Sequence, residues 1–210
     1  MYSIVIEVSN SFGMFADPST GSEATSFILP PPSACKGIID AICRLRNATV
    51  NIVAVGICRP PAFENCTTNS YSSKRKSDLQ RKGAPTQLHE TILSNPCFQI
   101  AAVASGPLNP INQGHSLQKQ IYRRIENKQS YWSVSLGRSE FMANYVGLPK
   151  TKICEDVNAI IPGMPMGNIV TRRENKRIEV RNGIARFVET PAIFVEDGII
   201  KFKEKDGRVI

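Results

Sequence analysis

Three consecutive prolines between an apolar run and a helical pattern constrain this chain more than any other feature. Pro30, Pro31 and Pro32 follow the apolar residues 26–29 and precede the segment SACKGIIDAIC, which ends at Cys43. Each proline fixes its own φ and disfavours helix in the residue before it, so the chain must bend here. Apolar residues then recur at helical spacing, and this pattern predicts a helix that packs against a sheet.

The start of this predicted helix is a candidate site for an anion. Ser33 stands at the expected N-cap position, where a hydroxyl accepts a hydrogen bond from a free backbone amide of the first turn. Lys36 and Gly37 lie in that turn. A positive helix end, free amides, a lysine and a residue without a side chain together favour a bound phosphate. An ordinary capped helix on a sheet explains the same spacing, so both interpretations stay open.

The net charge of +8 comes from 26 lysines and arginines against 18 acidic residues. Such a surplus favours a polyanionic partner, and nucleic acid is the first candidate. Single-stranded RNA recognition needs cationic groups for phosphates and planar groups for bases. The sequence places basic and aromatic residues together in two stretches, which hold Tyr71, Lys74, Arg75 and Lys76, and Arg123, Arg124, Tyr131, Trp132 and Arg138. Each aromatic residue alone is more typical of a core, and the basic run near Lys74 is equally typical of a solvated loop.

The six cysteines show no CxxC spacing and no cluster with either histidine. This pattern predicts reduced, packed thiols and neither a zinc site nor another cofactor. The chain shows no secretory segment at its start and no apolar run long enough to span a membrane. We therefore expect a cytoplasmic protein.

Strand and helix patterns alternate along the chain and predict an α+β fold. Strand patterns occupy residues 2–8, 49–58, 88–93 and 97–104. Residues 116–128 repeat Leu117, Ile121 and Ile125 at four-residue spacing, which predicts a helix with a buried stripe. Farther on, Asn182-Gly183 and Asp197-Gly198 interrupt alternating segments and predict the turns of antiparallel strands. The order strand, helix, strand favours a ferredoxin-like or RRM-like unit.

Three segments carry a resemblance to a known family. PPPSACKGIIDAI, residues 30–42, resembles the signature P-P-S-A-A-R-G-I-L-E-A-I of the fifth family of CRISPR-associated proteins in its type I-C branch. Residues 59–65 and 69–74 resemble that family's R-P-x-x-F-x-N and N-E-x-S-S-K patterns. Residues 129–141 resemble G-Q-S-F-x-x-P-x-L-G-C-R-E-F, with Arg138 and Ser139 where the pattern has cysteine and arginine.

The resemblance implies a fold, a function and a set of partners. The fold is a ferredoxin-like or RRM-like RNA-binding domain over residues 1–145, with an inserted basic β-hairpin thumb at about residues 59–90, and a C-terminal antiparallel β extension over residues 146–210. The function is that of a non-catalytic subunit that binds the 5′ handle of crRNA in a type I Cascade surveillance complex. The partners are crRNA, a backbone subunit of the seventh Cas family, the large subunit and, indirectly, target DNA, without a membrane.

The residues expected to contact RNA come from the helix start, the thumb and the later basic and aromatic stretch. They are Ser33, Lys36, Gly37, Tyr71, Ser73, Lys74, Arg75, Lys76, Arg123, Arg124, Tyr131, Trp132 and Arg138. A backbone is also expected to approach Gly137 closely, because glycine offers no side chain there.

Some members of the I-C branch are metal-independent endoribonucleases that process pre-crRNA repeats. They carry a tyrosine at the end of the first helix and a lysine-histidine pair at the start of the second. The matched segments place Cys43 at the tyrosine and Leu117-Gln118 at the pair, so the resemblance implies that this chain is not an enzyme. Endoribonuclease activity with His115 as fallback base remains the alternative, and a free-standing RNA chaperone is a third interpretation.

Overall fold

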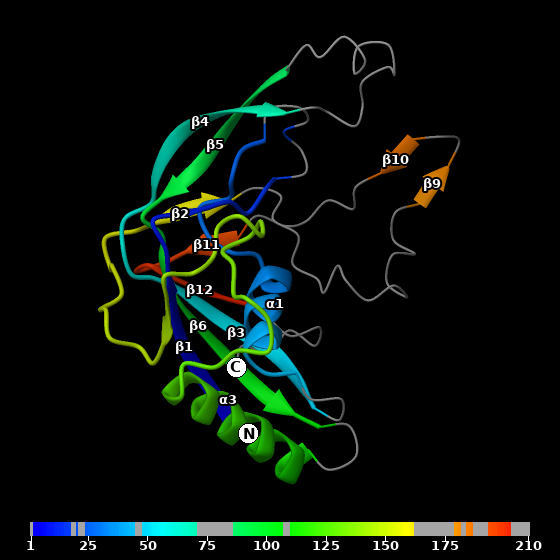
Figure 1. Ribbon diagram of the computed structural model, residues 1–210, viewed down its shortest axis with the longest axis vertical. Helices are drawn as coiled ribbons and strands as arrows, with labels where there is room; N and C mark the ends of the chain where they lie inside the picture. The colour runs from blue at the N-terminus through cyan, green and yellow to red at the C-terminus, as the bar shows by residue number, and fades with distance from the viewer. Residues whose placement is uncertain are drawn as a thin grey trace.

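The computed structural model describes residues 2–17, 20, 24–44, 48–70, 86–106, 110–161, 179–181, 184–186 and 193–202. A five-stranded antiparallel sheet in the order β12-β3-β6-β1-β7 forms the centre of the fold (Figure 1). Its strands are β1 (Tyr2–Ser9), β3 (Thr49–Ile57), β6 (Cys97–Ser105), β7 (Tyr145–Gly147) and β12 (Ile199–Lys201). Within the described residues the helices are α1 (Pro32–Ile42) and α3 (Pro110–Glu126). The expected mixture of helices and antiparallel strands is confirmed.

Both helices bury their apolar stripes in the same core as one face of the sheet. Because side chains alternate along a strand, Ile4, Ile6 and Val8 of β1 share a face, and all three belong to the buried cluster. Leu117 and Ile121 of α3 are 1% and 0% exposed, which confirms the predicted stripe. No helix in the described part of the chain is long and apolar enough to cross a membrane.

The segment after β7 covers the other face of the sheet at the end where Cys97 begins β6. The backbone N–H groups of Lys150 and Thr151 donate to the carboxylate of Glu7, which lies in β1. Farther along, the N–H of Cys154 donates to the carbonyl of Ile57 at 2.8 Å. Glu7 is therefore buried on this second face, although the sequence around it is typical of an apolar strand.

Strands β4 and β5, which lie between β3 and β6 in the sequence, form a second antiparallel sheet with β2, in the order β2-β5-β4 (Figure 1). It contains β4 (Ala62–Ser70), β5 (Thr86–Ser94) and the short β2 (Phe12–Gly13). The pairing of β4 with β5 extends from Ala62 opposite Ser94 to Ser70 opposite Thr86. Residues 12–13 look like part of a loop in sequence, but Phe12 pairs with Ser94 because the edge of β5 offers free backbone groups.

The C-terminal strands are short and belong to different sheets. Strand β8 (Ala159–Ile161) pairs with β11 (Ile193–Val195), and β9 (Glu179–Arg181) pairs with β10 (Ile184–Arg186), each antiparallel. The predicted turn is present: Asp197 and Gly198 have φ of 50° and 70°. After this turn β12 pairs with β3 of the central sheet. The division of the chain near residue 145 stays a prediction, and the predicted turn at residues 182–183 lies outside the described residues.

Both helices begin at a proline, earlier than the sequence predicts. The N-cap of α1 is Pro31, and no side chain caps this helix end. The prediction that Ser33 is the N-cap is therefore wrong. Proline suits the first helical position because its φ is already helical and its missing N–H would have no partner there. The same reason applies to α3, which begins at Pro110 rather than near residue 116.

Candidate nucleic-acid interface

The C-terminal end of α1 is held by groups from two later parts of the chain. The backbone N–H groups of Tyr131 and Trp132 donate to the carbonyl of Ala41 at 2.8 and 2.9 Å. Nη1 of Arg124 donates to the carbonyl of Ile42 at 3.2 Å. The last carbonyls of a helix have no partner within the helix and carry its negative end. Two amides and one guanidinium satisfy them here, which fixes residues 131–132 beside the helix.

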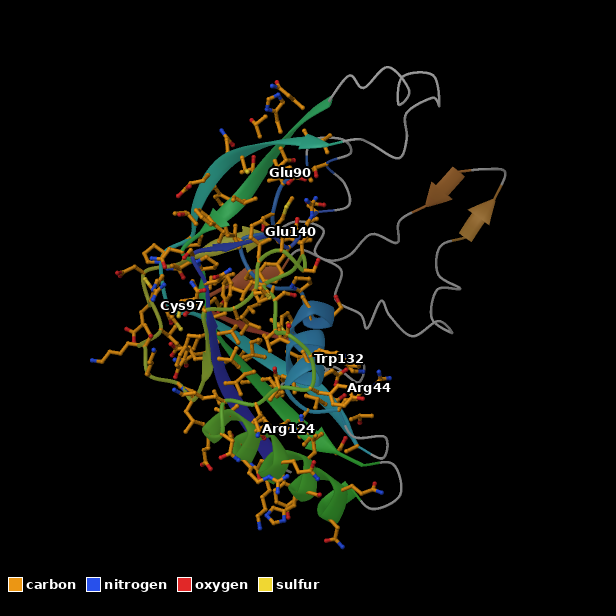
Figure 2. The ribbon with its side chains drawn as sticks, in the orientation of Figure 1. Arg44, Glu90, Cys97, Arg124, Trp132 and Glu140 are labelled. Carbon is orange, nitrogen blue, oxygen red and sulfur yellow. The ribbon has the colours of Figure 1, made fainter. Side chains whose placement is uncertain are left out.

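Two exposed aromatic rings stand at this end of α1. Tyr131 is 57% exposed and Trp132 is 50% exposed, so neither ring belongs to the core. Their centroids are 4.6 Å apart and the ring planes meet at 83°. Cζ of Arg44 lies 5.8 Å from the centroid of the Trp132 ring (Figure 2), within reach of a cation–π interaction. The fixed backbone and exposed faces suit these rings for stacking on bases.

Cys43 follows α1 and lies beneath two arginines of α3. Its side chain is buried, and its sulfur lies 3.8 Å from Oε1 of Gln120. Burial raises the pKa of this thiol, and the charges of Arg124 and Arg123 lower it by less. The thiol is therefore protonated at neutral pH. We name the group around it, Arg44, Arg123, Arg124, Tyr131 and Trp132, the basic-aromatic cluster; all of its members except the half-buried Arg124 are exposed.

One face of α1 extends this cluster toward the start of the helix. Lys36 and Asp40 are four residues apart on α1, which places them on one face, and Arg44 follows two residues after the helix ends at Ile42. Burial raises the pKa of Asp40, and the charges of Lys36 and Arg44 oppose that shift. Lys36 lies about 9 Å from Ile42 along the helix axis, and Arg44 lies beyond that helix end. A chain of nucleotides can span that distance.

The surroundings of Ser33 and Gly37, the other two residues predicted at the helix start, give no specific indication of a binding site. Ser33 is half-buried and makes no capping hydrogen bond. Gly37 is exposed, and a Cβ added there would meet nothing within 4 Å. Space around this turn is therefore open, but the structure shows no close approach that requires glycine.

Arg138 lies away from the basic-aromatic cluster. Its Nη1 is 2.6 Å from Oε1 of Glu90 in β5 and 3.8 Å from Oε1 of Glu140. Figure 2 places Glu90 and Glu140 at the end of the molecule opposite Arg124. Two carboxylates thus face this guanidinium, and the structure does not bring it beside Arg123 and Arg124. The neighbouring Gly137 has φ of 91°, and the carbonyl of Met14 occupies the place of a Cβ, which confirms the predicted close approach.

The thumb residues of the predicted site lie outside the described residues. These are Tyr71, Ser73, Lys74, Arg75 and Lys76. The histidines are described: Nδ1 of His89 lies 3.1 Å from Oγ1 of Thr67 in the β4–β5 pair, and the exposed His115 packs its ring 5.1 Å from that of Tyr2.

The two residues aligned with the ribonuclease pair make structural contacts. Leu117 is buried in the core. Nε2 of Gln118 donates to the carbonyl of Ser3 at 2.6 Å. Neither of these contacts involves Cys43.

Sequence reasoning missed two features. Arg44 was not predicted to contact RNA, because its partner Trp132 is distant in sequence. Its spacing of four residues from Asp40 was the sequence signal that could have drawn attention to it. The group Glu7, Cys58 and Cys97 was also missed, because its members come from β1, from the residue after β3 and from β6. Their ligand atoms lie within 4.8 Å of one another, so the structure brings together a set that the spacing of cysteines alone does not indicate.

Comparisons with known proteins give a matching family model and solved structures of similar fold. The model of the Cas_Cas5d family, described as CRISPR-associated protein (Cas_Cas5), matches residues 3–185. The crystal structure of a CRISPR-associated protein is 17% identical, with a TM-score of 0.60, over 100% of this chain and 95% of that chain. A functionally uncharacterized protein from Streptococcus mutans is 16% identical, with a TM-score of 0.57, over 100% and 96%. At these identities the two structures establish likeness of fold alone. No curated protein matches the chain.

Proposed function

This chain belongs to the Cas_Cas5d family of CRISPR-associated proteins, and from that membership we propose that it is a non-catalytic, RNA-binding subunit of a type I Cascade surveillance complex. In this proposal its ligand is the 5′ handle of crRNA. Its protein partners are a backbone subunit of the seventh Cas family and the large subunit, and through them it acts on target DNA. It works in the cytoplasm in antiviral defence.

The basic-aromatic cluster is the observation that carries this proposal. Arg44 is exposed beside the exposed Trp132 ring, and the exposed Arg123 acts on Cys43 at the same helix end, which supplies cations for phosphates and faces for bases. Because the planes of Tyr131 and Trp132 meet at 83°, two bases stacked on them would not stack on each other. That geometry suits an unpaired, splayed strand better than a duplex. Affinity would then come mainly from phosphates and would fall with salt.

The strand order supports an RRM-like RNA-binding core. Strands β3, β6, β1 and β7 lie side by side in this order in the sheet. Along the chain the order is β1, α1, β3, β6, α3 and β7, with the insertion left out. This is the strand, helix, strand, strand, helix, strand order of a ferredoxin-like unit. The β4–β5 pair is the insertion that we assign to the thumb. Residues 71–85 connect its strands and contain the basic run from Lys74 to Lys82, so the thumb would carry positive charge over the first spacer nucleotides.

The surroundings of Cys43 support the absence of catalysis. RNA cleavage without a metal needs a group that accepts the proton of a 2′-hydroxyl. The Cys43 thiol has a raised pKa, the adjacent Gln120 amide does not titrate, and guanidinium groups cannot act as bases. His115 packs against Tyr2 instead. We therefore propose that this position binds RNA without cleaving it.

Intrinsic fluorescence tests RNA binding at the cluster, because Trp132 is the only tryptophan. A short single-stranded repeat-derived RNA should quench this fluorescence on binding, and Arg44→Ala should weaken binding several-fold. Lys152→Ala is the matched control, since Lys152 is exposed on the segment that covers the other face of the sheet. RNA binding that leaves Trp132 fluorescence unchanged would show that the cluster is not the interface.

A denaturing gel tests the absence of catalysis separately. Repeat RNA incubated with the purified chain and a chelator should stay intact. Discrete products that disappear in His115→Ala would establish the endoribonuclease alternative instead. Cleavage products on the gel would not change the result of the fluorescence measurement, so the two experiments test cleavage and binding independently.

A further inference from the structure

Cys58 and Cys97 lie directly opposite each other where β3 ends and β6 begins. The N–H of Cys58 donates to the carbonyl of Cys97 at 2.9 Å, and the adjacent pair is Ile57 opposite Phe98. Opposite residues in such a hydrogen-bonded pair have Cα atoms about 5.5 Å apart, and their side chains share a face. Disulfides need Cα atoms about 4.4–6.8 Å apart. The two backbones are therefore already placed for a disulfide.

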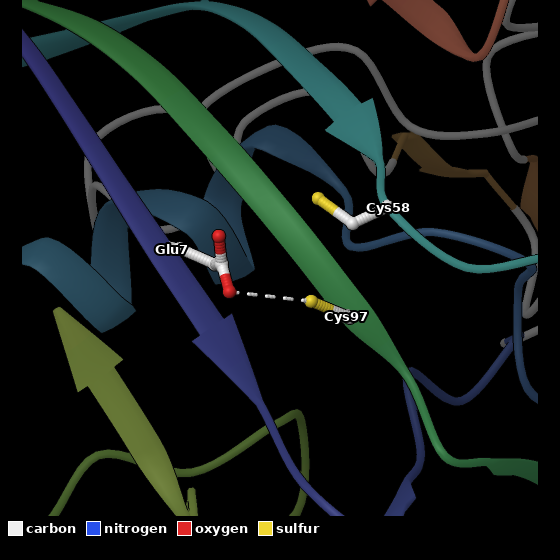
Figure 3. A group of neighbouring side chains, drawn as sticks. All are labelled: Glu7, Cys58 and Cys97. Atoms are coloured by element: carbon white, nitrogen blue, oxygen red, sulfur yellow. Dashed lines mark hydrogen bonds between the residues drawn. The ribbon is translucent and has the colours of Figure 1, made fainter. Parts of the chain in front are cut away.

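The two thiols and Glu7 lie close together (Figure 3), with their ligand atoms within 4.8 Å of one another. The S–H of Cys97 donates to Oε1 of Glu7 at 3.7 Å. The neighbouring thiols lower the pKa of Cys97 and raise that of Cys58; burial and the charge of Glu7 act to raise the pKa of Cys97, and the charge of Arg59 acts to lower it. Cys97 is thus the thiol of the pair that ionises first, and the thiolate is the reactive form of cysteine.

Access to this pair is restricted to small molecules. Cys97 is 1% exposed and Cys58 is 7% exposed. Cys97 lines a small cavity together with Arg59 and Pro96. Because both thiols are nearly buried, we expect a small oxidant to reach them more readily than a bulky disulfide reagent.

We propose that Cys58 and Cys97 form an oxidisable dithiol that hydrogen peroxide converts to a disulfide. The Cys97 thiolate attacks one peroxide oxygen, the O–O bond breaks, and a sulfenic acid forms while the released hydroxide takes up the proton lost by Cys97. The Cys58 sulfur then attacks the sulfenic sulfur, and the S–O bond breaks. The leaving hydroxide departs as water with the Cys58 proton. Two thiols and one peroxide give one disulfide and two waters, and two electrons pass to the peroxide.

The position of this disulfide gives it a structural effect. Cys58 immediately precedes the inserted segment that contains β4 and β5, and Cys97 immediately follows it. The cross-link would close a loop that contains the whole insertion and would fix its base to the central sheet. Such a cross-link stabilises mainly by constraining the unfolded chain, more so for long loops. We expect the melting temperature to rise by about 5 °C or more on oxidation.

A metal ion is the competing occupant of this group, and the hydrogen bonds of Glu7 argue against it. Oε2 of Glu7 already accepts from the N–H groups of Lys150 and Thr151, and Oε1 accepts from the Thr151 hydroxyl, each at 2.8 Å. A structural zinc site needs four protein donors, whereas this group offers three ionisable side chains, of which Glu7 is already held by hydrogen bonds to the protein. The thiol pair needs no further ligand.

Peptide mapping after oxidation of the reduced, native full chain tests the proposal. Hydrogen peroxide should remove the mass of two hydrogen atoms and join the peptides that contain Cys58 and Cys97. The rise in melting temperature should reverse with dithiothreitol, persist in Cys66→Ser and vanish in Cys97→Ser. The wild-type peptide map needs no variant, so it decides the matter even if Cys97→Ser does not fold.

Three results would overturn the proposal. The first is oxidation of other cysteines without a peptide that joins residues 58 and 97. The second is a joined peptide that forms only in denaturant. The third is stoichiometric zinc in the purified chain that blocks oxidation until a chelator removes it, which would make the group a metal site.

Discussion

The carboxylate of Glu7 shows how a buried charge fastens one segment to another. It is 0% exposed and accepts three hydrogen bonds at 2.8 Å from Lys150 and Thr151. Burial acts to raise its pKa, but these hydrogen bonds outweigh burial and hold the pKa below its usual value of 4.5. Backbone amides favour the charged form in place of a basic side chain. The segment after β7 is therefore fixed to β1 by one side chain.

Glu7→Gln should lower the free energy of unfolding by about 1–3 kcal/mol at pH 7, because hydrogen bonds to the charged form are lost. Since the folded pKa is lowered, this contribution is complete above the unfolded value of 4.5 and is lost as pH falls through the folded pKa. Urea unfolding of wild type and variant should thus show a difference that shrinks below pH 4.5. Exposed Glu155→Gln is the control. A difference independent of pH would contradict this role.

Helix α1 has different partners at its two ends. Its start at Pro32 has no side-chain cap, whereas its last carbonyls accept from Arg124, Tyr131 and Trp132. Its negative end therefore attracts the guanidinium groups that make up the candidate interface. The sequence alone directs attention to the positive start of the helix instead. The element thus positions its functional groups through its C-terminal end.

Ser33→Ala should change the free energy of unfolding by less than about 0.5 kcal/mol, because this hydroxyl makes no capping hydrogen bond. An N-cap serine would cost about 1 kcal/mol when replaced by alanine. Arg124→Ala is the informative comparison, since it removes the hydrogen bond to Ile42. Urea unfolding of both variants measures the two costs. A loss near 1 kcal/mol in Ser33→Ala would restore the N-cap interpretation.

At the scale of the molecule, positive side chains from distant parts of the chain meet around one helix. Lys36 comes from α1, Arg44 follows the end of that helix, and Arg123 comes from α3. Their charges act on Asp40 and Cys43, which are neighbours in the same region. Arg138 is instead paired with Glu90. The surplus of +8 is therefore concentrated in part on the helix side of the sheet.

Arg123→Ala should weaken RNA binding across sequences and reduce the slope of log affinity against log salt by about one unit, because one phosphate contact is lost. Lys74→Ala in the thumb should have the same effect if the thumb also contacts phosphates. Binding titrations at four salt concentrations measure each slope. Lys152→Ala should retain the wild-type slope. An unchanged slope in Arg123→Ala would remove this residue from the interface.

Particular residues show what sequence reasoning can and cannot reach. The stripe of Leu117 and Ile121, the close approach at Gly137 and the turn at Asp197 were predicted, because each follows from periodicity or backbone freedom over a few residues. The helix starts were misplaced, because a proline that bends the chain and a proline that begins a helix look alike in sequence. The composition alone favoured a buried Trp132, and this expectation is wrong because the ring is 50% exposed; its neighbour Arg44 comes from a distant part of the chain.

The amino-acid sequence by itself determined the α+β class, the family, the positive charge and the buried stripes, because these depend on residue type and on local spacing. Tertiary structure alone decided which charges meet. It buried Glu7 beneath a segment that follows β7, paired Arg138 with Glu90, placed Cys58 opposite Cys97 and left Trp132 exposed beside Arg44. The physical reason is that such contacts depend on how strands and helices pack across the sheet, which no local pattern of residues records.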